Sequence, residues 1–146
     1  MINRKNIAII GLGNIGTYLY NYLQVNKEIL RKKNNCIPNI KYVSAKNKKK
    51  KRKFKINKDK WLANYLNATT AKDVDIIVEL IGGSEGPAKK LVFQALRNKK
   101  HVVTANKALI AKYGDQLSKI AEENNVNLEF EAAVCGGVPI IRSLKE

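Results

Sequence analysis

Long hydrophobic runs are absent from this sequence of 146 residues. No stretch of about 18 uninterrupted apolar residues occurs, so a membrane span is excluded, and the short apolar segment near the N-terminus does not fit a secretory signal. Cysteine and histidine are scarce, with two Cys and one His. Cys36 and Cys135 lie far apart without metal-ligand spacing, which excludes a zinc site and suits free thiols in a reducing compartment. We therefore expect a cytoplasmic protein with no membrane partner.

Acidic residues are also few. The sequence contains 12 Asp and Glu and 28 Lys and Arg, which gives a formal net charge of +16. The excess is local: residues 41–60 hold eleven basic residues and one acid, whereas the other 126 residues carry 17 basic and 11 acidic groups. Such a block is usually a solvated loop whose like charges repel. Apart from Phe54, no aromatic residues are interleaved with this basic block, so we do not expect nucleic acid as a partner. The alternative is a non-catalytic module whose basic loop binds nucleic acid.

Short apolar runs alternate with helical patterns along the chain. Apolar residues at helical spacing predict about four helical turns after Gly16, a helix at 61–66, a helix that begins near Pro87 and another around 117–121. Because short connections join these elements, we predict a doubly wound α/β fold, with a mainly parallel sheet and helices on both faces. The predicted strands cover residues 7–10, 40–45, 74–81, 101–104 and 126–131.

A glycine-rich segment, residues 11–16, follows the first predicted strand. It matches the dinucleotide fingerprint GxGxxG, and its place between a strand and a helix gives the match meaning. Gly11 permits the tight turn, Gly13 lets the backbone approach a pyrophosphate, and Gly16 allows the helix to pack closely on the strand. The alternative is a glycine turn that merely joins two elements. The first helical turn also offers free N–H groups to phosphate; its residues include Asn14 and Ile15.

The second predicted strand ends at Ser44-Ala45-Lys46 and has no carboxylate after it until Asp59. An acidic residue at this place would bind the ribose 2′-OH of NAD, whereas basic groups accommodate the 2′-phosphate of NADP. The sequence therefore favours NADP over NAD. Lys46 and Lys48 are the nearest basic candidates, and Ser44 is a further donor.

Three more segments follow predicted strands: residues 82–88, 104–107 and 131–139. In a parallel sheet these loops emerge at the carboxyl edge, where ligands of doubly wound folds bind. Glycine pairs at 82–83 and 136–137 allow the backbone to approach a ligand closely. We expect one site assembled from these dispersed loops.

These segments resemble a known family, the N-terminal cofactor domain of homoserine dehydrogenase, and the resemblance covers nearly the whole chain. It implies NAD(P)-dependent interconversion of aspartate 4-semialdehyde and homoserine, on the route to threonine, isoleucine and methionine. Another amino-acid dehydrogenase with the same cofactor domain is a nearer rival, because fold alone does not fix the substrate. The segments that carry the resemblance are residues 11–16, 78–83 with 86–88, 102–107 and 131–140.

The resemblance also implies roles for individual residues. Lys107 matches a lysine that lies beside the substrate, takes part in proton transfer and borders the cofactor. The residues that match the nicotinamide side of the site are Gly82, Gly83, Thr104, Ala105 and Asn106. A monovalent cation such as sodium is implied at the domain junction, held by the Glu131 side chain and the carbonyls of Val134, Gly136 and Val138.

The C-terminal residues open a helix-like segment that no partner helix or strand follows. We therefore expect a dinucleotide-binding domain over residues 1–135, followed at 136–146 by the start of a substrate domain, so that the chain is a fragment of a longer protein. The family's substrate domain, with its carboxylates and second lysine, is missing. We expect the full-length protein to be a homodimer that acts on a small molecule, and this chain alone to be inactive.

Overall fold

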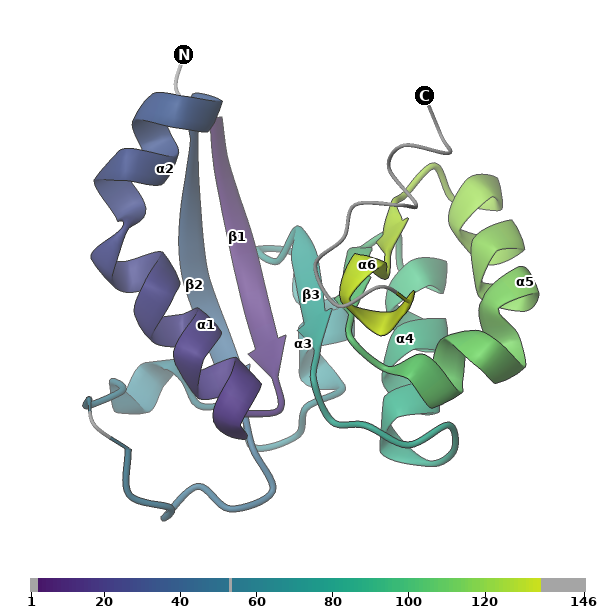
Figure 1. Cartoon of the computed structure of the whole chain (residues 1–146), viewed down its shortest axis with the longest axis horizontal. Coiled ribbons are helices and arrows are strands. Elements are labelled where there is room, and N and C mark those ends of the chain that lie inside the picture. Colours follow the sequence, from purple (N-terminus) through teal and green to yellow (C-terminus); the bar gives the residue numbers. More distant parts are fainter. Residues whose placement is uncertain (1–2, 53, 135–146) are drawn as a thin grey trace.

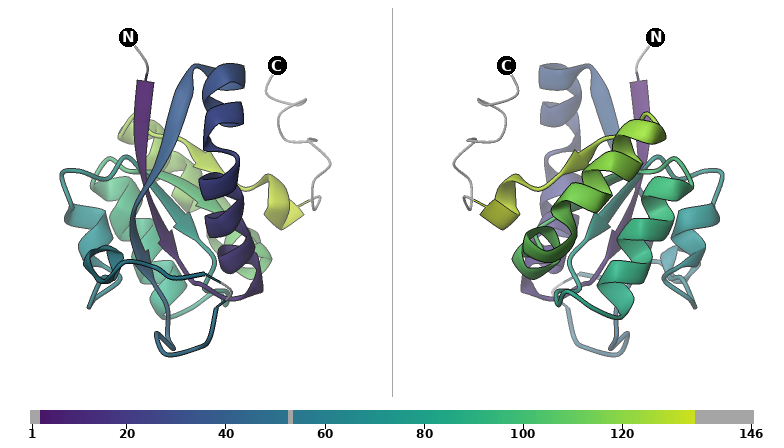
Figure 2. Two further views of the ribbon diagram at one scale, coloured as in Figure 1. Left: turned by 90° about the vertical axis from the view of Figure 1, so that its left-hand side faces the viewer. Right: turned by 90° about the vertical axis from the view of Figure 1, so that its right-hand side faces the viewer.

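The computed structural model describes residues 3–52 and 54–134, which form a parallel sheet with helices on both faces (Figures 1 and 2). The order of the five strands is β2-β1-β3-β4-β5. This arrangement confirms the predicted doubly wound α/β fold. The strands are β1 (Asn3–Ile10), β2 (Cys36–Ser44), β3 (Ile76–Glu79), β4 (His101–Thr104) and β5 (Leu128–Glu129).

Helices α1 and α2 cover one face of the sheet, and α3, α4 and α5 cover the other (Figure 2). Among the helices of the described residues, none combines the length and apolar character that a bilayer crossing requires. The helices are α1 (Asn14–Val25), α2 (Lys27–Asn34), α3 (Asn67–Thr70), α4 (Pro87–Arg97), α5 (Lys107–Glu123) and α6 (Glu131–Val134), with a short 3-10 turn, η1 (Lys58–Lys60).

The central strand β1 is buried on both faces, as its continuous apolar run predicts. Ile9 belongs to the cluster that contains Tyr20 of α1, whereas Ile10 belongs to the cluster that contains Leu91 of α4. Because successive side chains of a strand point to opposite faces, one short segment contributes to both cores. The two cores fix the strand whose carboxyl end carries the glycine-rich turn.

The helical segment after the glycine-rich turn is divided, whereas the sequence predicts one continuous helix. Helix α1 ends at Val25 and α2 begins at Lys27. The Asn26 N–H keeps the regular helical bond to the Tyr22 carbonyl at 2.9 Å, while its side-chain Nδ2 donates to the same carbonyl at 3.0 Å. Asparagine competes in this way with regular helical bonding, which explains a break inside an apolar pattern of helical period.

The prediction of a helix over residues 61–66 is wrong. Trp61 instead forms a parallel bridge with Val43, and the Leu62 N–H donates to the Val43 carbonyl at 3.0 Å. The apolar side chains of this segment have helical spacing and pack against the two hydrophobic cores, although the backbone that carries them is irregular. Pairing with β2 takes precedence over local helical spacing, and it places Trp61 beside the basic loop.

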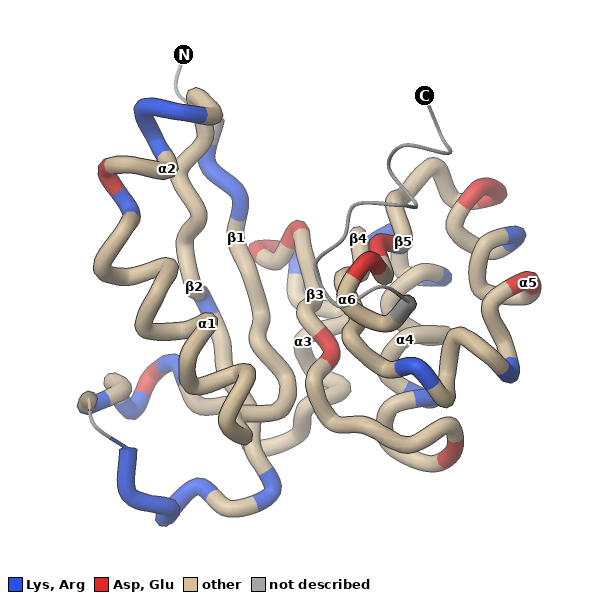
Figure 3. The backbone as a smooth tube through the Cα atoms, in the orientation of Figure 1, with Lys and Arg blue, Asp and Glu red and all other residues tan. Residues whose placement is uncertain are grey.

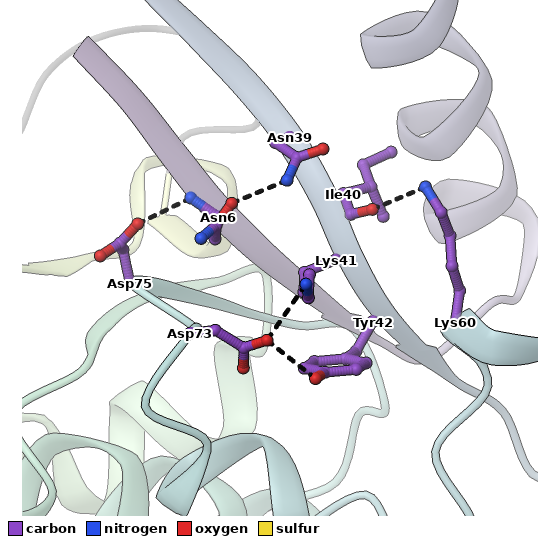
Figure 4. Close-up of polar contacts among 8 residues, drawn as sticks. All are labelled: Asn6, Asn39, Ile40, Lys41, Tyr42, Lys60, Asp73 and Asp75. Carbon is purple, nitrogen blue, oxygen red and sulfur yellow. Dashed lines mark hydrogen bonds and ion pairs between the residues drawn. The ribbon is translucent and has the colours of Figure 1, made fainter.

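Polar contacts fix β2 against the turn that precedes β3 (Figure 4). The Lys41 ammonium and the Tyr42 hydroxyl both contact one oxygen of Asp73, at 3.2 and 3.0 Å. Burial alone would raise the pKa of Asp73, but these hydrogen bonds outweigh it and lower the pKa. The same view shows hydrogen bonds that connect β1, β2 and this turn, made by Asn6, Asn39 and Asp75.

Candidate functional site

The turn between β1 and α1 depends on glycine at two positions for different reasons. Gly11 has φ +109°, and a Cβ there would lie 2.4 Å from the Leu80 carbonyl oxygen. Gly16 is buried in the first turns of α1, and its Cβ would lie 2.0 Å from the Gly11 carbonyl oxygen. No side chain is accommodated at such distances without backbone movement. Gly16 brings α1 close to the turn that precedes it, and Gly11 brings that turn close to Leu80, which follows β3.

Gly13 is different, because a Cβ at this position would meet nothing within 4 Å in the part of the chain that the structure describes. It is exposed and forms the N-cap of α1, and it has no side chain to accept from the free N–H groups of the first helical turn. Those N–H groups, with the helix dipole behind them, form an anion site. Open space at Gly13 therefore fits the close approach of a phosphate. Asn14 and Ile15, both exposed, occupy the first helical positions.

A cavity of about 760 Å³ lies beside this turn. The glycine-rich turn, the end of β2, the basic loop and the residues after β3 enclose it. Its volume and its position at the carboxyl edge of a parallel sheet are those of a ligand site in a doubly wound fold. The lining residues are Ile10, Gly11, Leu12, Gly13, Ser44, Ala45, Lys46, Asn47, Lys50, Arg52, Ala63, Tyr65, Leu80, Ile81 and Pro87.

The charge on this cavity comes from the loop after β2, where basic residues follow one another along the backbone (Figure 3). Lys46 lines the cavity together with Lys50 and Arg52, which the sequence analysis did not single out. Lys48 is not among the lining residues, and its Nζ lies 6.0 Å from the ring centre of Trp61. Among the described residues that line the cavity, none is acidic. Ser44 is buried, and its carbonyl accepts from the Gly11 N–H at 2.9 Å.

Glu79 at the end of β3 is completely buried, and no pattern in the sequence predicted a role for it in the site. One carboxylate oxygen accepts from the N–H groups of Ile81 and Gly82, at 2.7 and 3.1 Å. The other accepts from the Thr104 hydroxyl at 2.5 Å. A buried carboxylate requires several donors of this kind. Glu79 thereby fixes the loop after β3 to the end of β4.

Asn106 extends this connection to the next loop. Its Oδ1 accepts from the Leu109 N–H at 3.1 Å and caps α5, while its Nδ2 donates to the Gly83 carbonyl at 2.7 Å. Its own N–H donates to the Thr104 hydroxyl oxygen at 3.0 Å. The loops after β3 and β4 are therefore brought together, as the sequence analysis expects. The residues predicted for the nicotinamide side lie here and not among those that line the cavity: Gly82, Gly83, Thr104, Ala105 and Asn106.

Lys107 follows Asn106 as the first residue of α5 and is exposed. Glu85, in the loop before α4, contacts Lys89 of α4 and both Lys112 and Tyr113 of α5, and so connects this loop to the two helices. The hydrogen bond from Lys112, followed by that from Tyr113, lowers the pKa of Glu85 to about 2. The carboxylate therefore stays ionised and holds the end of the loop through neutral and mildly acidic pH.

The residues predicted for a cation site lie partly outside the described range. Glu131 begins α6 and is half-buried, and Val134 ends that helix. Gly136 and Val138 fall in residues 135–146, outside the described residues, as does the predicted start of a second domain at residue 136. Within residues 3–52 and 54–134, no group of three or more His, Cys, Asp or Glu is placed to hold a metal. The cation site stays a prediction.

Known proteins are similar to this chain in sequence and in fold. A family model described as the homoserine dehydrogenase NAD binding domain matches residues 11–131. A homoserine dehydrogenase of Bacillus subtilis is 39% identical over 140 residues, which are 96% of this chain and 32% of the relative. A crystal structure of S. aureus homoserine dehydrogenase matches with a TM-score of 0.83 and 36% identity, over 92% of this chain and 33% of its own.

A hyperthermophilic archaeal homoserine dehydrogenase in complex with NADPH has a TM-score of 0.73 and 25% identity, over 97% of this chain and 48% of its own. The chain spans about a third of the length of the curated relatives that it matches.

Proposed function

The chain belongs to the family of homoserine dehydrogenase NAD-binding domains, and we propose that it binds NADP in preference to NAD within a longer enzyme. That enzyme interconverts aspartate 4-semialdehyde and homoserine, on the route to threonine, isoleucine and methionine. The observation that carries the cofactor preference is the cavity beside the glycine-rich turn, whose described lining contains Lys46, Lys50 and Arg52 and no acid.

The residues present fit a dinucleotide phosphate. Gly13 leaves the space that a Cβ would fill, and the N-terminus of α1 presents its free N–H groups there. Lys46 and Lys50 border the same cavity and supply positive charge toward a 2′-phosphate, with Ser44 as a further donor. When bound, the reduced nicotinamide supplies hydride to an aldehyde. NAD is a weaker ligand of the same cavity.

Lys107 is the residue that we propose for proton transfer. Reduction of an aldehyde places negative charge on its oxygen, which requires a proton or a nearby cation. Lys107 is exposed at the start of α5, after the loop that Asn106 and Thr104 hold in place. An ammonium at this edge of the sheet supplies both the charge and the proton. The fixed loop explains how its position is maintained.

We further propose a monovalent cation, held by Glu131 and the carbonyls of Val134, Gly136 and Val138, which strengthens the junction with the rest of the enzyme. Carbonyl and carboxylate oxygens are suitable ligands for a hard cation. We propose a homodimer for the full-length protein. We also place the protein in the cytoplasm, because a free Cys36 thiol suits a reducing compartment.

Titration of the chain with NADPH and NADH tests the proposed cofactor. We expect quenching of the single tryptophan, Trp61, by both ligands, with NADPH bound at least about tenfold more tightly, the factor that about 1.4 kcal/mol provides. The preference should shrink when salt is added, because the charges are exposed. Equal affinity for the two cofactors would remove the preference, and binding of neither would refute the proposed function.

Replacing Lys107 by alanine in the longer enzyme tests its role in catalysis. We expect kcat to fall by about 10²-fold or more, a typical contribution of proton transfer by a positioned side chain. The Kd for NADPH should stay within about twofold, since Lys107 is not among the residues that line the cavity. Lys119→Ala, which removes an exposed lysine of the same helix, is the matched control. Unchanged turnover in Lys107→Ala would exclude the proposed role.

A further inference from the structure

Arg52 differs from Lys46 and residues 48–51, which are exposed, because its side chain is half-buried and its guanidinium is turned onto the protein's own backbone. Nη1 donates to the carbonyls of Lys48 and Lys50, at 3.2 and 3.0 Å. Nη2 donates to the carbonyls of Asn47 and Leu12, at 3.2 and 3.4 Å. The four N–H groups of the two terminal nitrogens are matched by four carbonyl contacts. Arg52 therefore connects the basic loop to the glycine-rich turn.

Trp61 supplies the second support of this guanidinium. The Arg52 guanidinium carbon lies 5.2 Å from the ring centre of Trp61, within the range of a cation–π contact. The ring is itself fixed, because Trp61 bridges to Val43 and the next N–H donates to the Val43 carbonyl. Arg52 is thus held between the glycine-rich turn and a residue paired with β2.

The loop requires such a support because its own charges oppose its fold. Lys46 and residues 48–51 are exposed lysines in almost continuous sequence. Like charges at this spacing repel and extend a chain. The guanidinium of Arg52 donates to backbone carbonyls of the loop and of the glycine-rich turn. These charge-assisted hydrogen bonds hold the loop closed against the repulsion between its lysines. The closed loop places Lys46 and Lys50 at the cavity.

We propose that Arg52 is a positioning residue, which sets the preference for a 2′-phosphorylated dinucleotide by holding Lys46 and Lys50 at the cavity. This inference rests on the proposed function, because it assigns a role within the same cavity. Its terminal N–H groups already donate to backbone carbonyls and are not free to bind a phosphate, so its role is to shape the loop. This role depends on the planar guanidinium, whose N–H groups reach several carbonyls at once. A lysine ammonium has no such planar set of donors, so lysine does not replace Arg52.

The test compares three variants of the chain, Arg52→Ala, Arg52→Lys and Lys49→Ala, by titration with NADPH and NADH. Lys49→Ala is the matched control, because it removes one exposed positive charge from the same loop and does not line the cavity. We expect both Arg52 variants to bind NADPH about tenfold more weakly, while Lys49→Ala stays within about twofold. NADH affinity should change by less than about threefold in all three, since the glycine-rich turn remains.

The emission of Trp61 gives an independent readout of loop position. We expect acrylamide to quench Trp61 more strongly in both Arg52 variants than in Lys49→Ala, and circular dichroism to report the same helix content. If the wild-type chain shows no preference for NADPH, the proposed function and the role of Arg52 fail together. If the preference is present but Arg52→Ala matches Lys49→Ala, only the role of Arg52 fails. Full NADPH affinity in Arg52→Lys would show that charge, and not position, is what Arg52 supplies, and would also overturn the inference.

Discussion

Replacing Glu79 by alanine should destabilise the domain by about 3 kcal/mol or more. The change leaves the buried Thr104 hydroxyl without its acceptor, a loss that costs about 1–3 kcal/mol. It also removes the acceptor of the Ile81 and Gly82 N–H groups, which belong to exposed residues. It also removes side-chain volume from the space between β3 and β4. Urea unfolding followed by circular dichroism measures the effect.

Glu79→Gln is the matched control for this prediction, because it keeps the shape and one carbonyl oxygen. That oxygen still accepts from Ile81 and Gly82, so the expected loss is about 1 kcal/mol, from the Thr104 contact alone. A Glu79→Ala protein as stable as the wild type would show that the buried carboxylate does not hold the two loops together.

Alanine at Gly16 should mainly lower stability, whereas alanine at Gly13 should mainly lower the affinity for NADPH. At Gly16 the new Cβ would lie 2.0 Å from the Gly11 carbonyl oxygen, so we expect a loss of stability of about 1–3 kcal/mol or more. At Gly13 a Cβ would meet nothing within 4 Å among the described residues, so stability should fall by no more than about 1 kcal/mol, the effect of alanine in place of glycine at an N-cap. The methyl group instead occupies the space proposed for a pyrophosphate, and NADPH affinity should fall about tenfold or more.

Thermal melting and NADPH titration of both variants measure this contrast, and each variant serves as the control for the other. Two results contradict the account of the turn. One is a Gly13→Ala protein that binds NADPH as tightly as the wild type. The other is a Gly16→Ala protein that melts at the temperature of the wild type.

The sequence predicts the framework of this fold because its signals are local. The apolar run that ends at Ile10, the proline that begins α4 at Pro87, and the strand at 101–104 depend on neighbours along the chain. The helix predicted over 61–66 fails for the opposite reason. Its apolar residues have helical spacing, but Trp61 pairs with Val43, 18 positions earlier, and no local pattern records that bridge.

The site shows the same division between local and distant signals. The glycines and Lys46 are found from the fingerprint and the strand end, whereas Glu79 looks like any acid in a strand until Thr104, 25 positions away, is placed beside it. Arg52 is hidden in a block of similar charges, and its contact with Leu12, 40 positions away, is what distinguishes it. A search for an acid flanked by an apolar strand and a following glycine pair would have found Glu79.

The most direct test of a dinucleotide site at the glycine-rich turn is a titration of the chain with NADPH, followed through its amide chemical shifts. We predict that the largest changes fall on Gly11, Gly13 and the first turn of α1, on the loop from Lys46 to Arg52, and on Ile81 to Gly83. Largest changes on Lys89, Phe93 and Gln116, which line a second cavity beside α4 and α5, or no changes at all, would contradict the account.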